Sequence, residues 1–391
     1  MTNPYGPGAG TPPPELSGRD SLLQDASLSL IRIKRGMPHK SFILVGLRGV
    51  GKTVLLSRID ELARELGYHT ALIENTEDKS LPQLLAPQLR RILFELDRLG
   101  EISVVVKRSF RVLKSFVGSI RIKTPGDFEL GLDVDAEKGA ADSGDLESDL
   151  TELFVSVGEA AADRHTAVAI IIDELQYLKP AEFSAAIMAI HRINQRKLPV
   201  ILIGAGLPQI VGLAGKSKSY AERLFAFPTV GALSADDAKL ALSRPAEREE
   251  VFFETAALDE LVRITSGYPY FIQEWGYHTW NTAPNSPITI GDVKNATDRA
   301  ISRLDESFFK VRFDRLTPSE KRYARAMAAL GSGPQRSGDI AAAYGTDVMS
   351  AGPIRAKLLA KGMIYSPSHG NNAFTVPLFN DYLKRVMPNE N

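Results

Sequence analysis

A short run of residues combines glycines with a lysine and a threonine at a spacing that binds phosphate. Residues 46–53 read Gly-Leu-Arg-Gly-Val-Gly-Lys-Thr, which fits the pattern G-x-x-x-x-G-K-T. The glycines let the backbone turn tightly and point its N–H groups at phosphate oxygens. Lys52 would reach the β- and γ-phosphates of a nucleoside triphosphate, and the Thr53 hydroxyl would bind Mg²⁺.

The flanks of this loop supply the structural context that the chemistry needs. Residues 41–45 form an apolar run typical of a buried strand, and residues 54–62 carry apolar side chains at helical spacing. A helix that begins near Lys52 would add its positive dipole end to phosphate binding. A glycine-rich turn formed by chance is the alternative, and it does not explain these flanks. We expect the nucleotide to contact Gly46, Arg48, Gly49, Val50, Gly51, Lys52, Thr53 and Val54.

Two carboxylates follow another buried strand. Residues 167–172 are apolar and lead directly into Asp173 and Glu174. In a triphosphatase, Asp173 would hold Mg²⁺ through water, and Glu174 would orient or deprotonate the attacking water. The alternative is a pair of acids that face solvent at the end of a strand.

A single arginine precedes the edge strand that we expect at residues 226–230. This residue, Arg223, has the position of an arginine finger, which stabilises charge on the transferred phosphoryl group from a neighbouring subunit. The assignment predicts a homo-oligomer or ATP-dependent self-association. An ordinary surface arginine is the alternative.

The elements that must position these residues alternate along the chain. Strands expected at residues 41–45, 68–74, 167–174 and 198–206 are separated by helices. This order predicts an α/β fold with a doubly wound parallel sheet, whose ligand lies at the carboxyl ends of the strands. Because the phosphate-binding loop and Asp173 both follow such ends, we expect them to meet.

The 391-residue length allows about two to three domains. We expect a flexible tail over residues 1–14, which are rich in proline and glycine, and an α/β base domain over residues 15–232. An all-helical domain would follow over residues 233–310. A third domain would cover residues 311–391.

An insertion at residues 101–149 contains a basic block, residues 107–123, and an acidic block, residues 127–149. Apolar and polar residues alternate at 119–123 and 128–134, which predicts a β-hairpin. Two interpretations stay open. The insertion is either a surface segment whose opposite charges screen each other, or a docking site for a protein or nucleic-acid partner.

The third domain has the pattern of a winged helix. A capping box at residues 317–320 opens one helix, and helices expected at residues 337–345 and 349–361 form a helix-turn-helix. Two strands expected at residues 362–366 and 372–377 would form the wing.

The charge of this domain favours double-stranded DNA as its partner. Residues 311–391 contain 11 Lys and Arg against 6 Asp and Glu, so their net charge is +5. We expect phosphate or base contacts from Arg355, Lys357, Lys361 and His369. Many winged helices bind protein instead, and this alternative stays open.

The overall composition excludes several classes of protein. The formal net charge is zero, so nucleic-acid binding must depend on local patches. The chain has no cysteine, and therefore no disulfide framework or thiolate zinc site. No apolar run approaches the ~18 residues of a membrane span, and no signal peptide opens the chain. We expect a cytoplasmic protein without membrane contact.

Taken together, residues 15–391 resemble the AAA+ ATPases of the origin-recognition type and related prokaryotic regulatory ATPases, and they are similar to STAND signalling ATPases. The resemblance lies in residues 16–20, the Walker A match at 46–53, the Walker B match at 170–174, and residues 266–271. It implies a base domain, a helical lid domain and a C-terminal winged helix, with ATP and Mg²⁺ as ligands.

The resemblance also implies roles for two further residues and predicts slow chemistry. Arg19 belongs to the segment that wraps the adenine, and Pro269 to the lid near the nucleotide. The strand that ends at residues 203–206 lacks the usual polar Asn or Thr. Residues 267–269 are Gly-Tyr-Pro where origin-recognition proteins have an arginine. These departures favour a slow ATPase that acts as a nucleotide switch.

The leading hypothesis is therefore an ATP-dependent switch that binds DNA through its winged helix. A STAND-type signalling ATPase is the second hypothesis, with a structural winged helix and a protein partner at residues 101–149. A small-molecule kinase or a GTPase is disfavoured, because the helical lid and winged helix fit neither. The guanine-specifying pattern Asn-Lys-x-Asp is also absent.

Overall fold

The structure, a computed structural model, describes residues 2–8, 10–98, 103–119 and 134–388. Most of the β-hairpin predicted at residues 119–134 lies outside these ranges. The chain forms two compact units, which are described separately. The α/β unit comprises residues 20–46 and 52–229, and the C-terminal unit comprises residues 1–19, 47–51 and 230–391.

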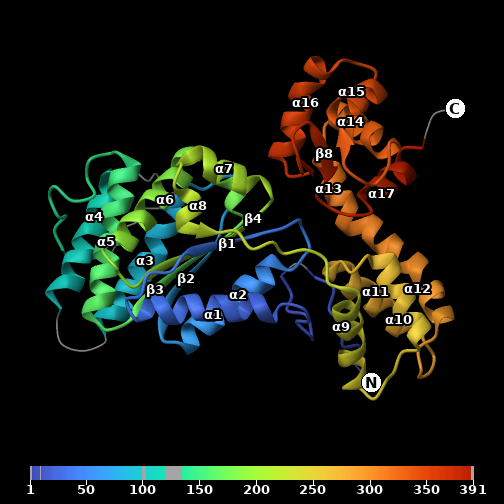
Figure 1. Cartoon of the computed structure of the whole chain (residues 1–391), viewed down its shortest axis with the longest axis horizontal. Helices are drawn as coiled ribbons and strands as arrows, with labels where there is room; N and C mark the ends of the chain where they lie inside the picture. The colour runs from blue at the N-terminus through green and yellow to red at the C-terminus, as the bar shows by residue number, and fades with distance from the viewer. Residues whose placement is uncertain (1, 9, 99–102, 120–133, 389–391) are drawn as a thin grey trace. The chain divides into compact units, whose positions relative to one another are not determined.

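The α/β unit is built on a five-stranded parallel sheet in the order β2-β3-β4-β1-β5, which confirms the predicted α/β class (Figure 1). The buried strands β1, β3 and β4 end beside one another, with Val45 opposite Gly206 and Ile172 opposite Gly204. The predicted loop and Asp173 therefore follow the same edge of the sheet. The strands are β1 Ser41–Val45, β2 Tyr68–Glu74, β3 Ala167–Asp173, β4 Val200–Gly206 and β5 Phe225–Ala226.

Helices cover both faces of this sheet (Figure 1). Alternate strand residues, such as Ile170 and Ile172, join the core formed with α3, α5 and α6, because successive side chains point to opposite faces. Helices α1 and α2 pack on the other face. The helices are α1 Asp20–Lys34, α2 Lys52–Glu65, α3 Leu81–Asp97, α4 Val104–Ser119, α5 Leu146–Asp163, α6 Pro180–Gln195, α7 Gln209–Ser217 and α8 Ala221–Leu224, with the short 3₁₀ turn η1 Leu175–Tyr177.

The basic block of the predicted insertion is not a surface segment. Most of it forms α4, whose residues Val106, Phe110 and Leu113 are buried in the main core. Their spacing of three and four residues is the apolar stripe of a helix, which the basic residues between them concealed. The charges do pair internally, since Arg111 Nε lies 2.9 Å from a carboxylate oxygen of Glu137.

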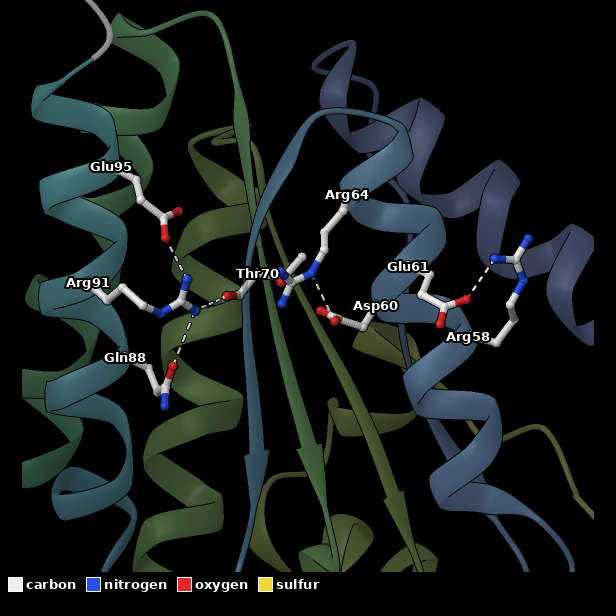
Figure 2. A network of polar contacts seen from close by, with 8 residues as sticks. All are labelled: Arg58, Asp60, Glu61, Arg64, Thr70, Gln88, Arg91 and Glu95. Atoms are coloured by element: carbon white, nitrogen blue, oxygen red, sulfur yellow. Dashed lines mark hydrogen bonds and ion pairs between the residues drawn. The ribbon is translucent and has the colours of Figure 1, made fainter. Parts of the chain in front are cut away.

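A network of polar contacts holds α3 to the edge strand β2 (Figure 2). Arg91 of α3 donates to the carbonyl oxygen of Thr70 at 2.5 Å and to Glu95 at 2.6 Å. The carbonyl lies on an edge strand and would otherwise depend on solvent, so Arg91 satisfies it. On α2, buried Asp60 accepts from Arg64 at 3.0 Å (Figure 2).

The C-terminal unit is mainly helical. One continuous helical run joins α12, the π-helical segment η2 and α13, and it leads toward α14. A small antiparallel sheet in the order β6-β8-β7 lies among the last helices. The elements are α9 Ala235–Glu247, α10 Thr255–Thr265, α11 Pro269–Thr282, α12 Ile290–Arg303, η2 Leu304–Phe309, α13 Lys310–Asp314, α14 Pro318–Ala329, β6 Gln335–Arg336, α15 Ser337–Tyr344, α16 Val348–Ala360, β7 Ile364–Tyr365, β8 Asn371–Phe374 and α17 Phe379–Val386.

The N-terminal segment is packed, although its composition predicts a flexible tail. The Tyr5 side chain is 3% exposed, and its hydroxyl donates to the carbonyl oxygen of Leu242. Gly276 of α11 makes room for it, because a Cβ there would come within 2.7 Å of the Tyr5 ring. Tyr5, packed against Gly276, thus anchors the proline- and glycine-rich segment. Across the described residues, no helix is long and apolar enough to cross a membrane.

Candidate functional site

The phosphate-binding loop has the backbone that its glycines predict. Gly49 and Gly51 have φ angles of 83° and 93°, in the left-handed region that favours glycine. A Cβ at Gly49 would also lie 3.0 Å from the Tyr268 ring, so the ring would have to move slightly to admit a side chain. Helix α2 begins at Lys52, as the sequence predicts. The loop therefore ends at a helix N-terminus, which favours bound anions.

In the α/β unit, the end of the loop meets the carboxylate of β3. The Thr53 hydroxyl donates to Asp173 Oδ2 at 2.5 Å, although the two residues are 120 positions apart. Asp173 is 5% exposed and Lys52 is 8% exposed. Burial, and then the charge of Glu174, raise the pKa of Asp173, while the Thr53 hydrogen bond and the charge of Lys52 oppose this rise.

These oxygen atoms fit a magnesium ion. Mg²⁺ prefers hard oxygen ligands, and it binds through one or two protein groups together with phosphates and water. Thr53 and Asp173 supply a hydroxyl and a carboxylate at hydrogen-bond distance from each other. Within the described ranges, no group of three or more His, Cys, Asp or Glu side chains forms a separate metal site.

Glu174 has an unusual backbone for a residue with a side chain. Its φ and ψ angles are 54° and 43°, in the left-handed region, and its N–H donates to Asp173 Oδ1 at 2.7 Å. Such strain persists only where the surrounding structure enforces it, and it is common at functional sites. The turn directs the chain from β3 straight into η1.

Gln176 connects this turn to the end of β4. Its side-chain amide donates to Glu174 Oε2, and its Oε1 accepts from the N–H of Leu207 at 3.1 Å. Gly206 leaves the space that this requires, since a Cβ there would lie 3.3 Å from Gln176 Oε1. Strand β4 ends without a polar side chain of its own, and Gln176 of η1 places its amide group at that end. A weak sign of this role in the sequence is the Asp-Glu-x-Gln run at residues 173–176.

Gln176→Ala is expected to lower kcat for ATP about 10-fold and to change the Kd for ATP less than about 2-fold, because Gln176 orients Glu174 rather than the phosphates. Steady-state turnover and equilibrium titration measure the two quantities. Gln195→Ala, at the exposed end of α6, is the matched control. An unchanged kcat in the Gln176 variant would contradict a positioning role.

In the C-terminal unit, other residues hold the loop from outside. The Arg19 guanidinium is buried and donates to the carbonyl oxygens of Val50, at 3.3 Å, and Gly231. The hydroxyl of Tyr268 donates to the carbonyl oxygen of Arg48. These contacts fix the loop's outer carbonyls, so its N–H groups are left to face a ligand.

Pro269 occupies the first turn of α11, between two residues that touch the loop. Tyr268 precedes it, and the N–H of Tyr270 donates to the carbonyl oxygen of Gly49 at 3.2 Å. Sequence reasoning identified the segment by Pro269 but missed both tyrosines. No spacing rule links them to a loop more than 200 residues earlier in the chain.

Arg223 and Arg355, two of the predicted site residues, have different surroundings. Arg223 is exposed on α8, directly before the edge strand β5. Arg355 donates to Asn372 at 2.6 Å and to Ser366 at 2.7 Å. These bonds tie α16 to the β7–β8 hairpin.

The other cations predicted to contact DNA differ in exposure. Lys361 lies 2.6 Å from the buried carboxylate of Glu320 and also donates to the carbonyl oxygen of Arg315. The Glu320 side chain is 1% exposed and that of Lys361 is 30% exposed, so loss of Lys361 would leave a buried carboxylate without its cation. Lys357 and His369 are exposed.

A further polar residue lies at the same sheet edge and was missed. Asn75 follows β2, is 2% exposed, and donates its backbone N–H to the carbonyl oxygen of Asp173 at 3.2 Å. Neither polar atom of its side chain has a hydrogen-bond partner among the described residues. A buried amide with no protein partner usually binds water or a ligand.

Comparisons with known proteins agree with this geometry. Residues 15–203 match the AAA ATPase domain, and residues 306–383 match a domain of unknown function (DUF8462). No curated protein matches the sequence.

Three solved structures are similar to most of this chain. The Walker-type ATPase of Pyrococcus abyssi has a TM-score of 0.59 at 17% identity, with 94% of this chain and 96% of that chain covered. The Aeropyrum pernix Orc1 protein in complex with DNA has a TM-score of 0.47 at 15% identity, with 95% and 93% covered. The Thermotoga maritima RuvB Holliday junction branch migration motor has a TM-score of 0.45 at 16% identity, with 91% and 92% covered.

The likeness to the Pyrococcus abyssi protein shows a shared fold, whereas TM-scores below 0.5 support no conclusion. The family match over residues 15–203 covers both motifs of the phosphate site. The strand order and the contact between Thr53 and Asp173 agree with that match. Residues 15–203 therefore match the AAA ATPase domain and contain both motifs of the phosphate site.

Proposed function

We propose that the protein is an ATP-dependent switch, in which ATP and Mg²⁺ bound at residues 46–54 control the C-terminal domain. The observation that carries the proposal is the hydrogen bond between Thr53 and Asp173 beside buried Lys52. This hydrogen bond joins the phosphate-binding loop to the carboxylate that ends β3, and these are the two motifs of a nucleotide-hydrolysing site. Neither motif alone would support hydrolysis.

The side chains take distinct roles in this proposal. Lys52 and the loop N–H groups bind the β- and γ-phosphates, and Thr53 and Asp173 hold Mg²⁺. When bound, Mg²⁺ neutralises charge on the phosphate oxygens. Glu174 accepts a proton from the attacking water, and Gln176 orients Glu174.

Slow hydrolysis fits the surroundings of Glu174. Strand β4 ends in Gly204-Ala205-Gly206 and offers no polar side chain of its own, and residues 267–269 contain no arginine. The proposal therefore includes a long-lived ATP-bound state. It also includes self-association, with exposed Arg223 acting on a neighbouring copy.

We further propose a lid domain over residues 233–310 and a winged helix over residues 311–391, after a base domain over residues 15–232. The succession α14, α15 and α16 with the sheet β6-β8-β7 supports the winged helix. Its net charge of +5 supports a DNA partner. Exposed Lys357 and His369 would contact DNA, while Arg355 and Lys361 would hold the helix in place.

Duplex DNA binding is expected to differ between the ATP-bound and ADP-bound protein, measured by fluorescence anisotropy at fixed salt. Lys357→Ala should weaken binding and reduce the slope of log affinity against log salt by about 1, because one phosphate contact is lost. Lys294→Ala, an exposed lysine on α12, is the matched control. Absence of duplex binding in both nucleotide states would contradict the DNA proposal.

A protein partner at the C-terminal domain is the second candidate, in line with a STAND-type ATPase. One observation favours it: Val348 and Met349 at the start of α16 are 49% and 89% exposed. Exposed apolar side chains at that position suit a protein surface better than phosphates. Nucleotide-dependent binding of protein but not DNA, lost in Met349→Lys, would decide for this candidate. A partner at residues 101–149 is less favoured, because α4 is a core helix.

A further inference from the structure

One helical segment of the C-terminal unit departs from regular geometry. Residues Leu304–Phe309, which form η2 between α12 and α13, are π-helical. The π-helix, with its i→i+5 hydrogen bonds, is rare and occurs mostly as single turns, which are frequent at functional sites. Two adjacent aromatic residues end this segment, Phe308 and Phe309, and their rings contact different parts of the unit.

Phe308 contacts the helix that holds the phosphate-binding loop. Its ring stacks on Tyr270 of α11 at a centroid distance of 4.4 Å and an interplanar angle of 20°. The backbone N–H of Tyr270 donates to the carbonyl oxygen of Gly49 at 3.2 Å, and loop residues 47–51 belong to the same unit. The packing is tight, because a Cβ at Gly49 would lie 3.2 Å from the Cβ of Tyr270. A shift of the loop backbone therefore moves the ring on which Phe308 stacks.

Phe309 contacts the last elements of the chain. It is 1% exposed, and its ring stacks on Tyr382 of α17 at a centroid distance of 5.3 Å. The ring of Phe379, at the start of α17, lies 5.9 Å from that of Phe309 and 5.6 Å from that of Phe374 on β8. Two neighbouring residues of η2 thus link α11, which holds the loop, to α17 and the small sheet.

A π-helical turn is an element with two discrete arrangements. Successive residues of an α-helix are about 100° apart, so conversion of the π turn to α geometry would rotate the two phenylalanines by about that angle relative to α12. Closely packed rings do not deform continuously, and they change between separate packings. Arg385 of α17 forms two hydrogen bonds to Asp305 of η2, at 2.8 and 2.6 Å, so a change in η2 also acts on α17.

We infer that η2 is a coupling element, through which a nucleotide on the phosphate-binding loop and the packing of α17 against β8 influence each other. The inference rests on the proposed function, because it requires a nucleotide on the loop, and it names the element that carries the nucleotide state to the C-terminal domain. Such coupling is reciprocal. A partner that stabilises the packing of α17 favoured by the nucleotide therefore also strengthens nucleotide binding.

The test is amide hydrogen exchange of the full chain, measured by mass spectrometry with and without Mg²⁺ and a non-hydrolysable ATP analogue. In the wild type, the analogue is expected to slow exchange at residues 371–386 about 10-fold, within the usual range of coupling between sites. Phe308→Leu and Tyr270→Leu each remove the ring stack from one side, and each should reduce this effect to less than about 2-fold. The double variant should lose no more than either single variant, because both break one contact.

Phe313→Leu is the matched control. Phe313 of α13 is half-buried, as Phe308 and Tyr270 are, so all three variants keep an apolar side chain at a partly open position and are expected to fold. Its printed ring contacts in the described chain are with Tyr382 at 5.8 Å and the ammonium group of Lys321, and not with the rings that lie beside the loop. The control should keep the full effect of the analogue at residues 371–386.

Persistence of the full effect in either Leu variant of the Tyr270–Phe308 pair overturns the inference. The inference also fails if the wild-type chain binds the analogue, as titration measures, while exchange at residues 371–386 stays unchanged. Both of these results leave the nucleotide site intact. If the wild-type chain does not bind the analogue, the proposed function fails and the inference fails with it.

Discussion

Lys52→Ala is expected to raise the Kd for Mg²⁺·ATP at least about 100-fold, because it removes a charge-assisted contact to the phosphates from a buried position. Lys52 is 8% exposed at the first position of α2, where its ammonium group and the helix dipole act on the same anion. The loss should appear in equilibrium titration with a fluorescent ATP analogue.

The fold should survive this change, because the turn depends on the glycines and not on the lysine. Far-UV circular dichroism and the thermal midpoint are expected to match those of the wild type. Lys216→Ala, an exposed lysine on α7, is the control for a generic loss of charge, and its affinity should equal that of the wild type.

Glu174→Gln is expected to lower kcat for ATP by about 10²- to 10⁴-fold, the range for loss of a general base. The amide keeps the shape of the side chain but cannot accept the proton from water. ATP affinity should stay within about 3-fold of wild type, since the role proposed for Glu174 is to act on the attacking water. Single-turnover measurements with saturating protein separate the chemical step from binding.

Glu222→Gln provides the control for this prediction, because Glu222 is an exposed carboxylate on α8 next to Arg223. Its kcat should be unchanged. If Glu174→Gln hydrolyses ATP at the wild-type rate, another group activates the water, and the assignment of the carboxylates is wrong. If it loses ATP binding as well, Glu174 supports the site structurally and is not shown to be the base.

The nucleotide motifs and the sheet could be predicted because their signals are local. The loop pattern lies between an apolar run and a helical one, and the Asp173-Glu174 pair directly follows five consecutive buried aliphatic residues from 168 to 172. Parallel strands that alternate with helices leave few possible arrangements, so both motifs had to end at one edge.

The residues that hold the loop could not be predicted, because their contacts cross long stretches of chain. Tyr268 and Tyr270, which contact the loop, follow it by more than 200 residues. Tyr5 lies in a segment whose composition indicates disorder, and its burial depends on the space at Gly276 and on its contacts with Trp280 and the carbonyl oxygen of Leu242. In α4, the basic residues between Val106 and Phe110 hid a core helix.

Contacts between distant elements also explain why the roles of Arg355 and Lys361 could not be predicted from the sequence. Arg355 and Lys361 have the spacing of a DNA-contacting face, but each is engaged by a partner from another element, Asn372 and Glu320. A sequence reports charge along a helix and not whether that charge is already paired. Exposed Lys357 is therefore the better probe of DNA binding.

The most direct test of the central claim, that residues 46–54 and Asp173 form one site for ATP with Mg²⁺, is a titration of ATP into the wild-type chain with and without Mg²⁺, beside Lys52→Ala. The account predicts saturable binding that Mg²⁺ strengthens in the wild type and that the variant loses. Binding of equal strength in the variant, or no binding by the wild type at millimolar ATP, would contradict it.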